Sequence, residues 1–286
     1  MVGKIYLIDK TQRINTGIYF QKKCFSLALM QEKEIKLSII TVCFNALDLL
    51  KGTVESVAKQ KCPGVEYIVI DGASSDGTVA YLESNPTIDR FISEPDGGLY
   101  DAMNKGMEFA DGQMIWFMNA GDTIYGTDTL PKLIQTIHPD TDIIYGEVML
   151  VNEIRKALGT RSELTTQKLP QNLSWTSMRW GMVVCHQGFL VRKSLAPKYD
   201  FSYGLVADID WVIKCLKAST TIQKTDFILA NYLQGGLSKT YFKRSMQSRF
   251  KVLATHFGLV QTAIAHIWII IRAGLFSIQR IGKERY

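Results

Sequence analysis

The first half of the chain alternates between short continuous apolar runs and segments whose apolar residues recur at helical spacing. Four apolar runs predict strands: LSIITVC (37–43), VEYIVI (65–70), IDRFIS (88–93) and QMIWFM (113–118). Three intervening segments predict helices: ALDLLKGTVESVAKQ (46–60), TVAYLES (78–84) and DAMNKGMEFA (101–110). Runs that are apolar on both faces are typical of parallel strands covered by helices. The order strand, helix, strand therefore predicts a doubly wound, mostly parallel α/β sheet.

After this sheet the pattern changes. The predicted elements are a helix at TLPKLIQTI (129–137), a strand-like run at DIIYGEVMLV (142–151), a loop-rich segment (152–179), an apolar run at MVVCHQGFLV (182–191) and a helix at DIDWVIKCLKA (208–218). The first half is thus expected to bind a nucleotide and the second half a substrate. We divide the chain into an N-terminal extension (1–36), a catalytic domain (37–240) and a C-terminal tail (241–286).

The N-terminal extension shows no clear periodicity. Met30 followed by QEKEIK is a natural start before the first strand, so the residues before it are expected to be an upstream extension or a loosely attached arm. The alternative is an edge strand at KIYLI (4–8). The apolar stretch FSLALM is too short for a signal peptide and no cleavage site follows it.

Charge and cysteine content point to the cytoplasm and to a membrane surface. Residues 239–286 hold nine Lys or Arg and a single acid, whereas residues 37–238 hold 17 basic and 23 acidic residues. An acidic body argues against nucleic acid as a partner, and a basic, apolar tail favours an anionic membrane. The five cysteines are widely spaced and form no CxxC pair, which favours reduced thiols over disulfides or a zinc site.

Acids and glycines follow the predicted strands in a consistent way. Asp71, Asp96 and Asp122 each come just after a strand and are expected to converge along one rim of the sheet. Asp76, in SSDGT, is instead expected to be a turn or helix cap. Neither a P-loop nor a GxGxxG motif after a strand is present. Clustered carboxylates without these motifs are typical of a divalent cation held against a diphosphate.

Four stretches together, LSIITVCFNA, VEYIVIDGASSDGT, SEPDGGLYDAMNKG and NAGD, closely resemble the family 2 glycosyltransferases, which have the GT-A fold. The resemblance covers about Leu37 to Ser238 and is strongest to bacterial members that build O-antigen, capsule and exopolysaccharide. It implies a set of nucleotide-binding residues. These are Thr41, Phe44, Asn45, Asp71, Asp96, Asn104 and Lys105. For Lys105 a solvated helix face is an equal alternative.

The NAGD stretch keeps one acid of the family's DxD motif. The resemblance implies that Asp122 is the metal ligand, while Asn119 and Gly121 stand where other members often have Asp. One carboxylate is adequate for Mg²⁺ or Mn²⁺, because the diphosphate and water supply the remaining ligands. We expect weak metal binding without nucleotide.

A base is also needed to deprotonate the acceptor hydroxyl. GLVADIDWVIKCLKA resembles the acidic motif that supplies this base, which assigns the role to Asp208 and makes Asp210 a supporting acceptor contact or a cap. The alternative is that both acids merely start a helix. CHQGFLVRKSL implies that His186 and Gln187 face the acceptor or phosphate, with a structural histidine as the alternative. Ser238, in GGLSK, is expected in a loop that closes over the diphosphate.

The C-terminal tail is predicted to be an amphipathic helix. Polar residues recur at helical spacing among apolar ones, and His266 and Arg272 interrupt the longest apolar run, which is short for a membrane span. A helix lying in the membrane interface is favoured. A single span, or a helix packed on the body or on a second copy in a homodimer, are the alternatives.

The prediction is therefore an inverting, metal-dependent glycosyltransferase of the hexosyltransferase type, peripheral on the inner face of the plasma membrane. It moves a sugar from a nucleotide-sugar donor, expected to be a UDP-sugar, to a glycan acceptor on a polyprenyl diphosphate. The chain has neither QxxRW nor several spans, which predicts addition of a single sugar per encounter. A sugar nucleotidyltransferase and a non-catalytic scaffold of a polysaccharide assembly complex remain as alternatives.

Overall fold

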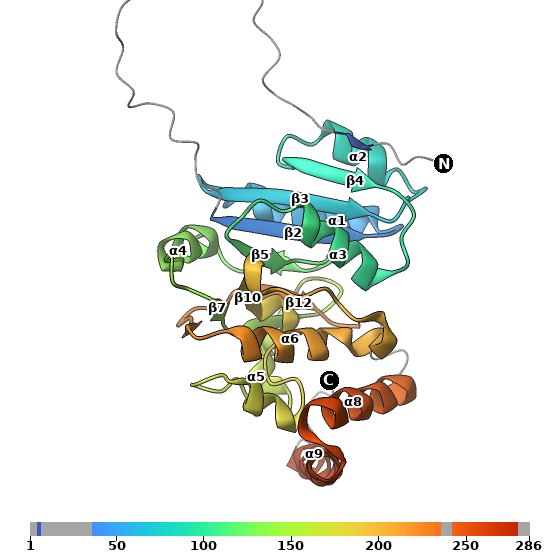
Figure 1. Ribbon diagram of the computed structural model, residues 1–286. Coiled ribbons are helices and arrows are strands. Elements are labelled where there is room, and N and C mark those ends of the chain that lie inside the picture. Colours follow the sequence, from blue (N-terminus) through green and yellow to red (C-terminus); the bar gives the residue numbers. More distant parts are fainter. Residues whose placement is uncertain (1–4, 7–35, 236–241, 280–286) are drawn as a thin grey trace, which may run out of the picture.

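The computed structural model describes residues 5–6, 36–235 and 242–279 of the chain. A central eight-stranded sheet has the strand order β1-β4-β3-β2-β5-β10-β7-β11 (Figure 1). Its strands are β1 (Ile5–Tyr6), β2 (Leu37–Cys43), β3 (Val65–Asp71), β4 (Arg90–Ser93), β5 (Met114–Phe117), β7 (Ile143–Tyr145), β10 (Phe189–Arg192) and β11 (Ile222–Lys224). A smaller sheet has the order β6-β12-β8-β9. It contains β6 (Thr123–Ile124), β8 (Val148–Val151), β9 (Ala157–Thr160) and β12 (Ala230–Leu233).

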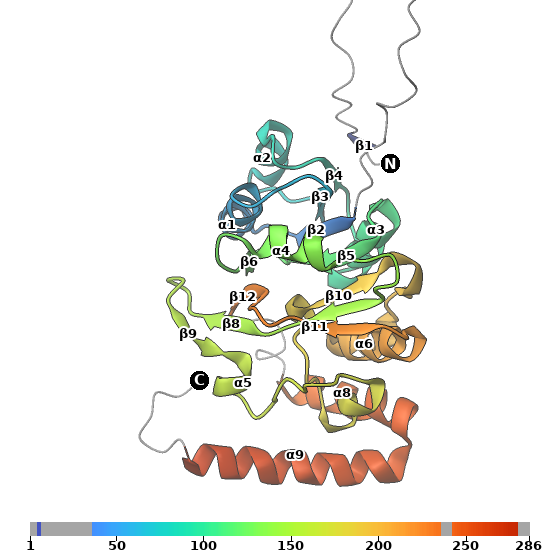
Figure 2. The same ribbon diagram turned by 90° about the vertical axis from the view of Figure 1, so that its left-hand side faces the viewer.

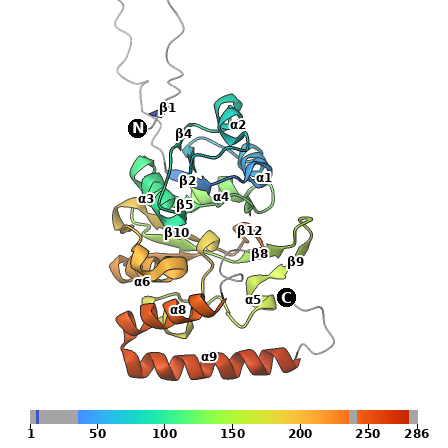
Figure 3. The same cartoon turned by 90° about the vertical axis from the view of Figure 1, so that its right-hand side faces the viewer.

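The four strands predicted in the first half form a parallel block, β4-β3-β2-β5. Every residue of β2 and β3 is buried, as their continuous apolar runs predicted. Alternate side chains enter two separate cores. Helices α1 (Leu47–Ala58), α2 (Thr78–Ser84) and α4 (Thr129–Thr136) cover one face, and α3 (Leu99–Phe109) and α6 (Ala207–Ala218) cover the other (Figure 3). The GT-A type of mixed α/β architecture expected from the sequence is therefore present.

The second half of the main sheet differs from a simple parallel continuation. β10 pairs antiparallel with both β5 and β7. The single strand-like run expected over 142–151 is divided between two sheets, because the chain leaves β7 at Gly146 and enters β8 two residues later. A Cβ on Gly146 would lie 2.1 Å from Thr225 Oγ1, and one on Gly188 would lie 2.5 Å from Gly146 O. The close contacts of Gly146 and Gly188 thus fix the point at which the chain passes from the main sheet to the smaller sheet.

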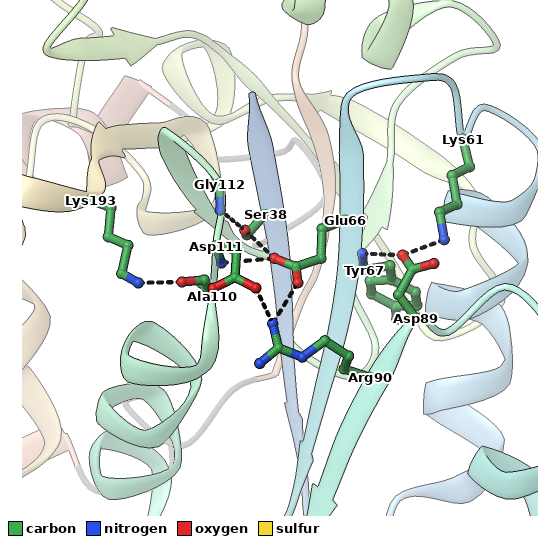
Figure 4. Close-up of polar contacts among 10 residues, drawn as sticks. All are labelled: Ser38, Lys61, Glu66, Tyr67, Asp89, Arg90, Ala110, Asp111, Gly112 and Lys193. Carbon is green, nitrogen blue, oxygen red and sulfur yellow. Dashed lines mark hydrogen bonds and ion pairs between the residues drawn. The ribbon is translucent and has the colours of Figure 1, made fainter. Parts of the chain in front are cut away.

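The amino end of the parallel block carries a network of paired charges (Figure 4). Arg90 Nη1 lies 2.9 Å from Glu66 Oε1 and 2.5 Å from Asp111 Oδ2. Ser38 Oγ donates to Glu66 Oε2 at 2.6 Å and accepts from Gly112 N at 2.8 Å. These groups satisfy one another, so this edge of the sheet holds the strands in register and leaves the opposite edge for chemistry.

The tail forms two helices. α8 (Phe242–Phe257) and α9 (Leu259–Gln279) are separated at Gly258, whose φ of +82° is in the left-handed region that favours glycine. α8 packs against α6 and the 3-10 helix η4 (Phe201–Val206), and α9 lies outside it along the body (Figure 2). The expected single tail helix is therefore corrected to a helix packed on the body followed by an outer one.

At the N-terminus, β1 pairs antiparallel with β4 at the edge of the main sheet. This matches the edge strand that KIYLI left open as an alternative. The rest of the predicted extension, including Met30, lies outside the described residues.

Candidate active site

The carboxyl ends of β2, β3, β4 and β5 meet at one rim of the sheet because these strands are parallel. Asp71 ends β3 at this rim, and the loops that leave the rim contain Phe44, Asp96 and Asp122. The sequence prediction that acids collect along one rim is therefore correct in its topology. The side chains, however, differ in burial and in hydrogen bonding, and these differences decide what each can do.

An open aromatic and a carboxylate flank the backbone of Gly72. The Phe44 side chain is 62% exposed, which is unusual for a large apolar residue. A Cβ on Gly72 would lie 2.8 Å from Asp96 Oδ2 and 3.2 Å from Phe44 Cδ2. Asp96 Oδ1 accepts a hydrogen bond from Gly98 N at 2.8 Å, which holds the carboxylate in place. A flat ring beside an acceptor is a suitable surface for a nucleoside.

Asp71 is fully buried and has its hydrogen bonds satisfied inside the protein. It accepts from Ser74 N at 3.0 Å, Ser74 Oγ at 2.5 Å and Ser93 Oγ at 2.6 Å. Burial, together with the charge of Asp71, raises the pKa of the neighbouring Cys43 thiol, which stays protonated. The expected contact of Asp71 with the nucleotide base would need an exposed carboxylate, and Asp71 does not present one. Instead Asp71 fixes the loop that follows β3.

Asn45 and Asp76 tie the first two rim loops together. Asn45 has a φ of 46°, and its Oδ1 accepts from Ser75 N at 2.9 Å. Asp76 Oδ2 accepts from Leu47 N at 2.9 Å, at the start of α1, so Asp76 has the capping role expected for it. Both contacts hold Phe44 between two anchored loops.

Three other residues predicted to bind nucleotide are used within the fold. Thr41 is fully buried, and its hydroxyl donates to Met118 O at 2.7 Å. Asn104 is buried and joins α3 to the backbone of Tyr199 through two hydrogen bonds. Lys105 Nζ lies 2.8 Å from Glu94 Oε1. The structure gives Thr41 and Asn104 positioning roles, because neither presents its polar group to solvent.

Asp122 and Gln187 were predicted separately, and the structure brings them together. Asp122 is buried at 5% exposure, and its Oδ2 accepts from Gln187 Nε2 at 2.8 Å while Oδ1 accepts from Leu233 N at 2.9 Å. Burial raises the pKa of Asp122 to about 7, although both hydrogen bonds and the positive charge of Arg155 oppose the shift. Near neutral pH the carboxyl therefore titrates, and a cation would favour its ionised form.

The NAGD turn offers a second oxygen for a cation. Asn119 Oδ1 is buried without a hydrogen-bond partner, and Asp122 N donates to Asn119 O at 2.9 Å, so the two residues belong to one turn. Carboxylate and amide oxygens suit Mg²⁺ or Mn²⁺. Within the described ranges there is no cluster of three or more His, Cys, Asp or Glu that could hold a metal. These two oxygens fit a cation whose remaining ligands come from a diphosphate and water.

Asp208, at the start of α6, is a half-buried acid beside Tyr100. Tyr100 Oη donates to Asp208 Oδ1 at 3.4 Å, and Ile209 N donates to the same oxygen at 3.0 Å. Burial raises the pKa of Asp208, and Arg249 on α8 is the main opposing influence. A carboxylate with a raised pKa is the kind of group that a general base requires.

Asp122 and Asp208 both influence the pKa values of Cys185 and Tyr232. Burial raises the pKa of the Cys185 thiol to about 11, and the charges of both acids contribute in the same direction. Both acids likewise add to the effect of burial in raising the pKa of Tyr232. Electrostatic influence falls with distance, so both carboxylates lie within electrostatic range of Cys185 and Tyr232.

Asp210 does not belong to this region, which corrects its assignment to the acceptor site. It is 1% exposed, and its carboxylate contacts His256 Nε2 on α8 at 2.7 Å and Lys214 Nζ at 2.8 Å. Burial disfavours its charge, but these two partners outweigh burial and lower the pKa of Asp210. Residues two apart on a helix point in different directions, so Asp208 and Asp210 cannot share one target. Asp210 instead attaches α8 to the body.

His186 follows the structural alternative. Its Nε2 lies 2.7 Å from Tyr199 Oη, and its ring packs against Phe117 and Trp211 with centroid distances of 5.3 and 5.5 Å. Burial lowers the pKa of His186 to about 4, so the imidazole is neutral. The expectation that it faces acceptor or phosphate is corrected to a core role. Ser238 lies outside the described residues.

Several residues near the site were missed by the sequence analysis. Tyr100 stands inside the quoted motif DGGLYDAMNKG, so the motif was the available signal. Arg155, Arg161 and Arg249 come from segments without a motif, and only the folded chain brings them near Asp122, Cys185 and Asp208.

Comparison with known proteins identifies the class. A family model described as glycosyl transferase family 2 matches residues 38–199, more than half of the chain. An uncharacterized glycosyltransferase of Mycobacterium tuberculosis (strain CDC 1551 / Oshkosh) is 35% identical over 187 residues, which cover 62% of this chain and 67% of that protein. The PGL/p-HBAD biosynthesis glycosyltransferase of Mycobacterium bovis (strain BCG / Pasteur 1173P2) is 28% identical over 244 residues, 78% of this chain and 86% of that protein. The chain belongs to glycosyl transferase family 2 and is a glycosyltransferase.

Solved structures show the same fold at low sequence identity. S. aureus TarS 1-349 has a TM-score of 0.61 and 17% identity, covering 86% of this chain and 73% of its own, and has also been solved with UDP-GlcNAc. The mannosyltransferase PcManGT from Pyrobaculum calidifontis, in complex with GDP-Man and Mn²⁺, has a TM-score of 0.58 and 15% identity, covering 88% of this chain and 77% of its own. The fold is thus that of the GT-A glycosyltransferases.

Proposed function

We propose that this glycosyltransferase transfers a sugar from a nucleotide-sugar donor, with inversion, to a glycan acceptor carried on a membrane lipid. The pathway proposed is synthesis of a bacterial surface polysaccharide such as O-antigen, capsule or exopolysaccharide. The observation that supports the proposal is that Asp122 and Asp208 both influence the pKa values of Cys185 and Tyr232, while Phe44 is exposed and Asp96 half-buried on the rim.

Asp208 is proposed to be the base. Its Oδ1 takes the proton of the acceptor hydroxyl while the hydroxyl oxygen forms a bond to the anomeric carbon. The bond from that carbon to the diphosphate oxygen breaks, and the diphosphate leaves with the electron pair. Attack from the opposite face inverts the configuration. Tyr100 orients the carboxylate, and burial gives Asp208 a higher affinity for the proton than an exposed acid has.

The leaving diphosphate is proposed to lie beside Asp122. Asp122 and Asn119 are the residues that would hold a divalent cation, whose chemistry is to neutralise the charge that develops on the diphosphate. Gln187 and the backbone of Leu233 orient the Asp122 carboxylate for this role. The Mn²⁺ complex of the structurally similar mannosyltransferase supports the choice of metal class.

The nucleoside is proposed to contact Phe44 through its ring and Asp96 through its ribose or base donors. The structurally similar proteins bind UDP-GlcNAc and GDP-Man, which supports a nucleoside diphosphate sugar as donor. We propose UDP as the nucleotide. The loops that present Phe44 and Asp96 are held in place by a layer of residues behind them: Thr41, Asn45, Asp71 and Asn104.

The proposal is tested by donor hydrolysis in the absence of acceptor. Purified protein with Mn²⁺ or Mg²⁺ is incubated with a panel of sugar nucleotides. We expect slow hydrolysis of one donor, which falls by about 10² or more in Asp208→Asn, in line with loss of a general base. Asp122→Ala should lose most of the metal-dependent rate.

Asp48→Asn is the matched control, because it removes an exposed carboxylate on α1 that, among the described residues, pairs with Lys51. Full activity of Asp208→Asn would contradict the assignment of the base. Inactivity of the wild-type protein towards every donor would favour the scaffold alternative. Release of pyrophosphate from a nucleoside triphosphate would favour a nucleotidyltransferase.

A further inference from the structure

A cavity of about 460 Å³ lies between the outer helix α9 and the segment around the 3-10 helix η1 (Trp175–Trp180). It is lined by Lys168, Pro170, Thr176, Ser177, Arg179, Trp180, Val183 and Arg272. We call it the basic pocket, because its lining includes three cations and no acid. The hydroxyl groups of Thr176 and Ser177 also line it, and each is within hydrogen-bond distance of Ser174 Oγ, at 2.8 and 3.3 Å. This is the composition of a site for a phosphate group.

The guanidinium groups of the basic pocket have unused donors. The Nε atoms of Arg179 and Arg272 are buried without hydrogen-bond partners, and among the described residues neither side chain forms an ion pair. Arg272 Nη2 donates to Trp180 O at 3.3 Å, which leaves most of its donors free for a ligand. Lys168 differs, since its Nζ already donates to Ser162 O. The two arginines are therefore the main candidates for an anion.

The helix that closes the basic pocket, α9, shows the reverse of the pattern in an ordinary soluble domain, because the charged side chain of Arg272 is turned inward and its large apolar side chains outward. Thr262 is buried and His266 and Arg272 are half-buried, whereas the exposed residues of α9 are mainly apolar, with Gln261 and Ser277 as uncharged polar exceptions. Nine large apolar side chains of α9 are between 47% and 73% exposed: Leu259, Val260, Ile264, Ile267, Trp268, Ile270, Ile271, Leu275 and Ile278. A continuous exposed apolar face of this length marks a contact surface.

The orientation of α9 selects a lipid surface as the contact. The apolar run expected to be short for a membrane span is corrected: the helical segment Leu259–Ile278 is long and apolar enough to cross a membrane by length and composition. In two views, α9 lies flat along the body (Figures 2 and 3). Its outer face carries no described acid or base, so it complements hydrocarbon and not a charged protein surface. Trp180, at the rim of the basic pocket, is 37% exposed, and tryptophan is favoured at membrane interfaces.

We infer that the basic pocket binds the exposed phosphate of an anionic lipid headgroup while the outer face of α9 rests in the same membrane. Arg179 and Arg272 donate to the phosphate oxygens, and Lys168 contributes charge at the entrance. The inference rests on the proposed function only in taking this lipid to be the acceptor's carrier.

The test measures binding of the full chain to vesicles, with no donor present. The vesicles contain phosphatidylcholine alone, or phosphatidylcholine in which phosphatidic acid replaces part of the lipid. We expect the wild-type protein to prefer the phosphatidic acid vesicles, and Arg179→Gln/Arg272→Gln to lose that preference by about thirtyfold. Lys59→Gln/Lys132→Gln removes the same charge from α1 and α4, on the opposite side of the body, and should lose less than about twofold.

Equal losses in the two double variants would show general charge attraction and would overturn the basic pocket as a headgroup site. Equal binding of the wild type to both kinds of vesicle would overturn it as well, because only the apolar face would then act. Binding of inorganic pyrophosphate that depends on both arginines, with no preference for phosphatidic acid, would assign the pocket to a soluble anion.

Lys168→Glu provides a second variant with little risk to folding, because Lys168 is exposed. It should weaken binding to phosphatidic acid vesicles by about tenfold without a change in thermal stability. Vesicle binding requires no sugar transfer, whereas the proposed function is judged by donor hydrolysis in Asp208→Asn. The two proposals can therefore fail separately.

Discussion

Burial separates the roles of acids that look alike in the sequence. Asp71 is fully buried and satisfied by serine donors, Asp122 is buried with a pKa raised to about 7, and Asp96 is partly exposed on the rim. The desolvation of a carboxylate and the number of its donors decide whether it holds a loop, meets a cation or meets a ligand. The two predictions at this scale concern single residues, Asp122 and Gly72.

The raised pKa of Asp122 predicts a pH dependence of stability. The folded state binds this proton more tightly than the unfolded chain, whose Asp pKa is about 3.9. The free energy of unfolding should therefore decrease by up to about 4 kcal/mol as the pH rises from about 4 to about 7 in a metal chelator. Asp122→Asn removes this dependence. The free energy of unfolding, measured with urea at several pH values, should therefore fall more steeply with pH in the wild type than in the variant. Parallel pH profiles would show that Asp122 does not titrate in this range.

Gly72 gives a test of the nucleoside surface. Gly72→Ala should weaken donor binding by about tenfold, because the new Cβ would lie 2.8 Å from Asp96 Oδ2 and would displace that carboxylate from a charge-assisted hydrogen bond. The measurement is a donor titration by calorimetry. Gly274→Ala is the matched control, since a Cβ there has no neighbour within 4 Å. Equal affinities of both variants would remove Gly72 from the donor site.

At the scale of elements, the helical repeat of α6 points the two acids of one sequence motif in different directions and so gives them different roles. Asp208 and Asp210 are close in sequence, yet α6 directs the first towards Tyr100 and the second towards His256 of α8. α6 is therefore both the carrier of the proposed base and the attachment point of the tail. Resemblance to a family motif identified Asp208, but it could not separate the two acids, because the partner of Asp210 lies 46 residues away.

Removal of His256 tests this attachment. His256→Ala should lower the free energy of unfolding by about 2 kcal/mol, because the buried Asp210 loses one of its two charge-stabilising partners. Chemical denaturation gives the value. His138→Ala, at an exposed histidine, should change stability by less than about 0.5 kcal/mol. If both variants lost the same stability, the contact between Asp210 and His256 would not hold α8 in place.

At the scale of the whole molecule, the active-site rim and the apolar face of α9 are connected through packed helices. α8 packs on α6 and η4, and α9 packs on α8 and η1 (Figure 2). A protein with this arrangement would keep its active site at a fixed height above a membrane. The helix is about 30 Å long by its residue count, so its contact with the membrane would be extended.

The exposed face of α9 predicts membrane partitioning. Ile267→Ser/Ile270→Ser should lower the partition coefficient onto phosphatidylcholine vesicles by more than about tenfold, since less apolar area would leave water. Melting temperature should be unchanged, because both side chains are exposed in the folded protein. Ile154→Ser is the control, as an exposed isoleucine outside the tail. Unchanged partitioning of the double variant would exclude α9 as the membrane contact.

Periodicity and motifs determined much of this protein without coordinates. The four parallel strands, their covering helices, the rim acids and the family followed from local patterns, because buried parallel strands and their helices leave a strong signal in the chain. Tertiary structure alone decided the rest: the branching at Gly146, the pairing of Asp122 with Gln187, the core role of His186, the attachment of Asp210 to α8 and the outward face of α9. These features depend on contacts between residues far apart in sequence, and burial and charge at such contacts are properties of the packed molecule.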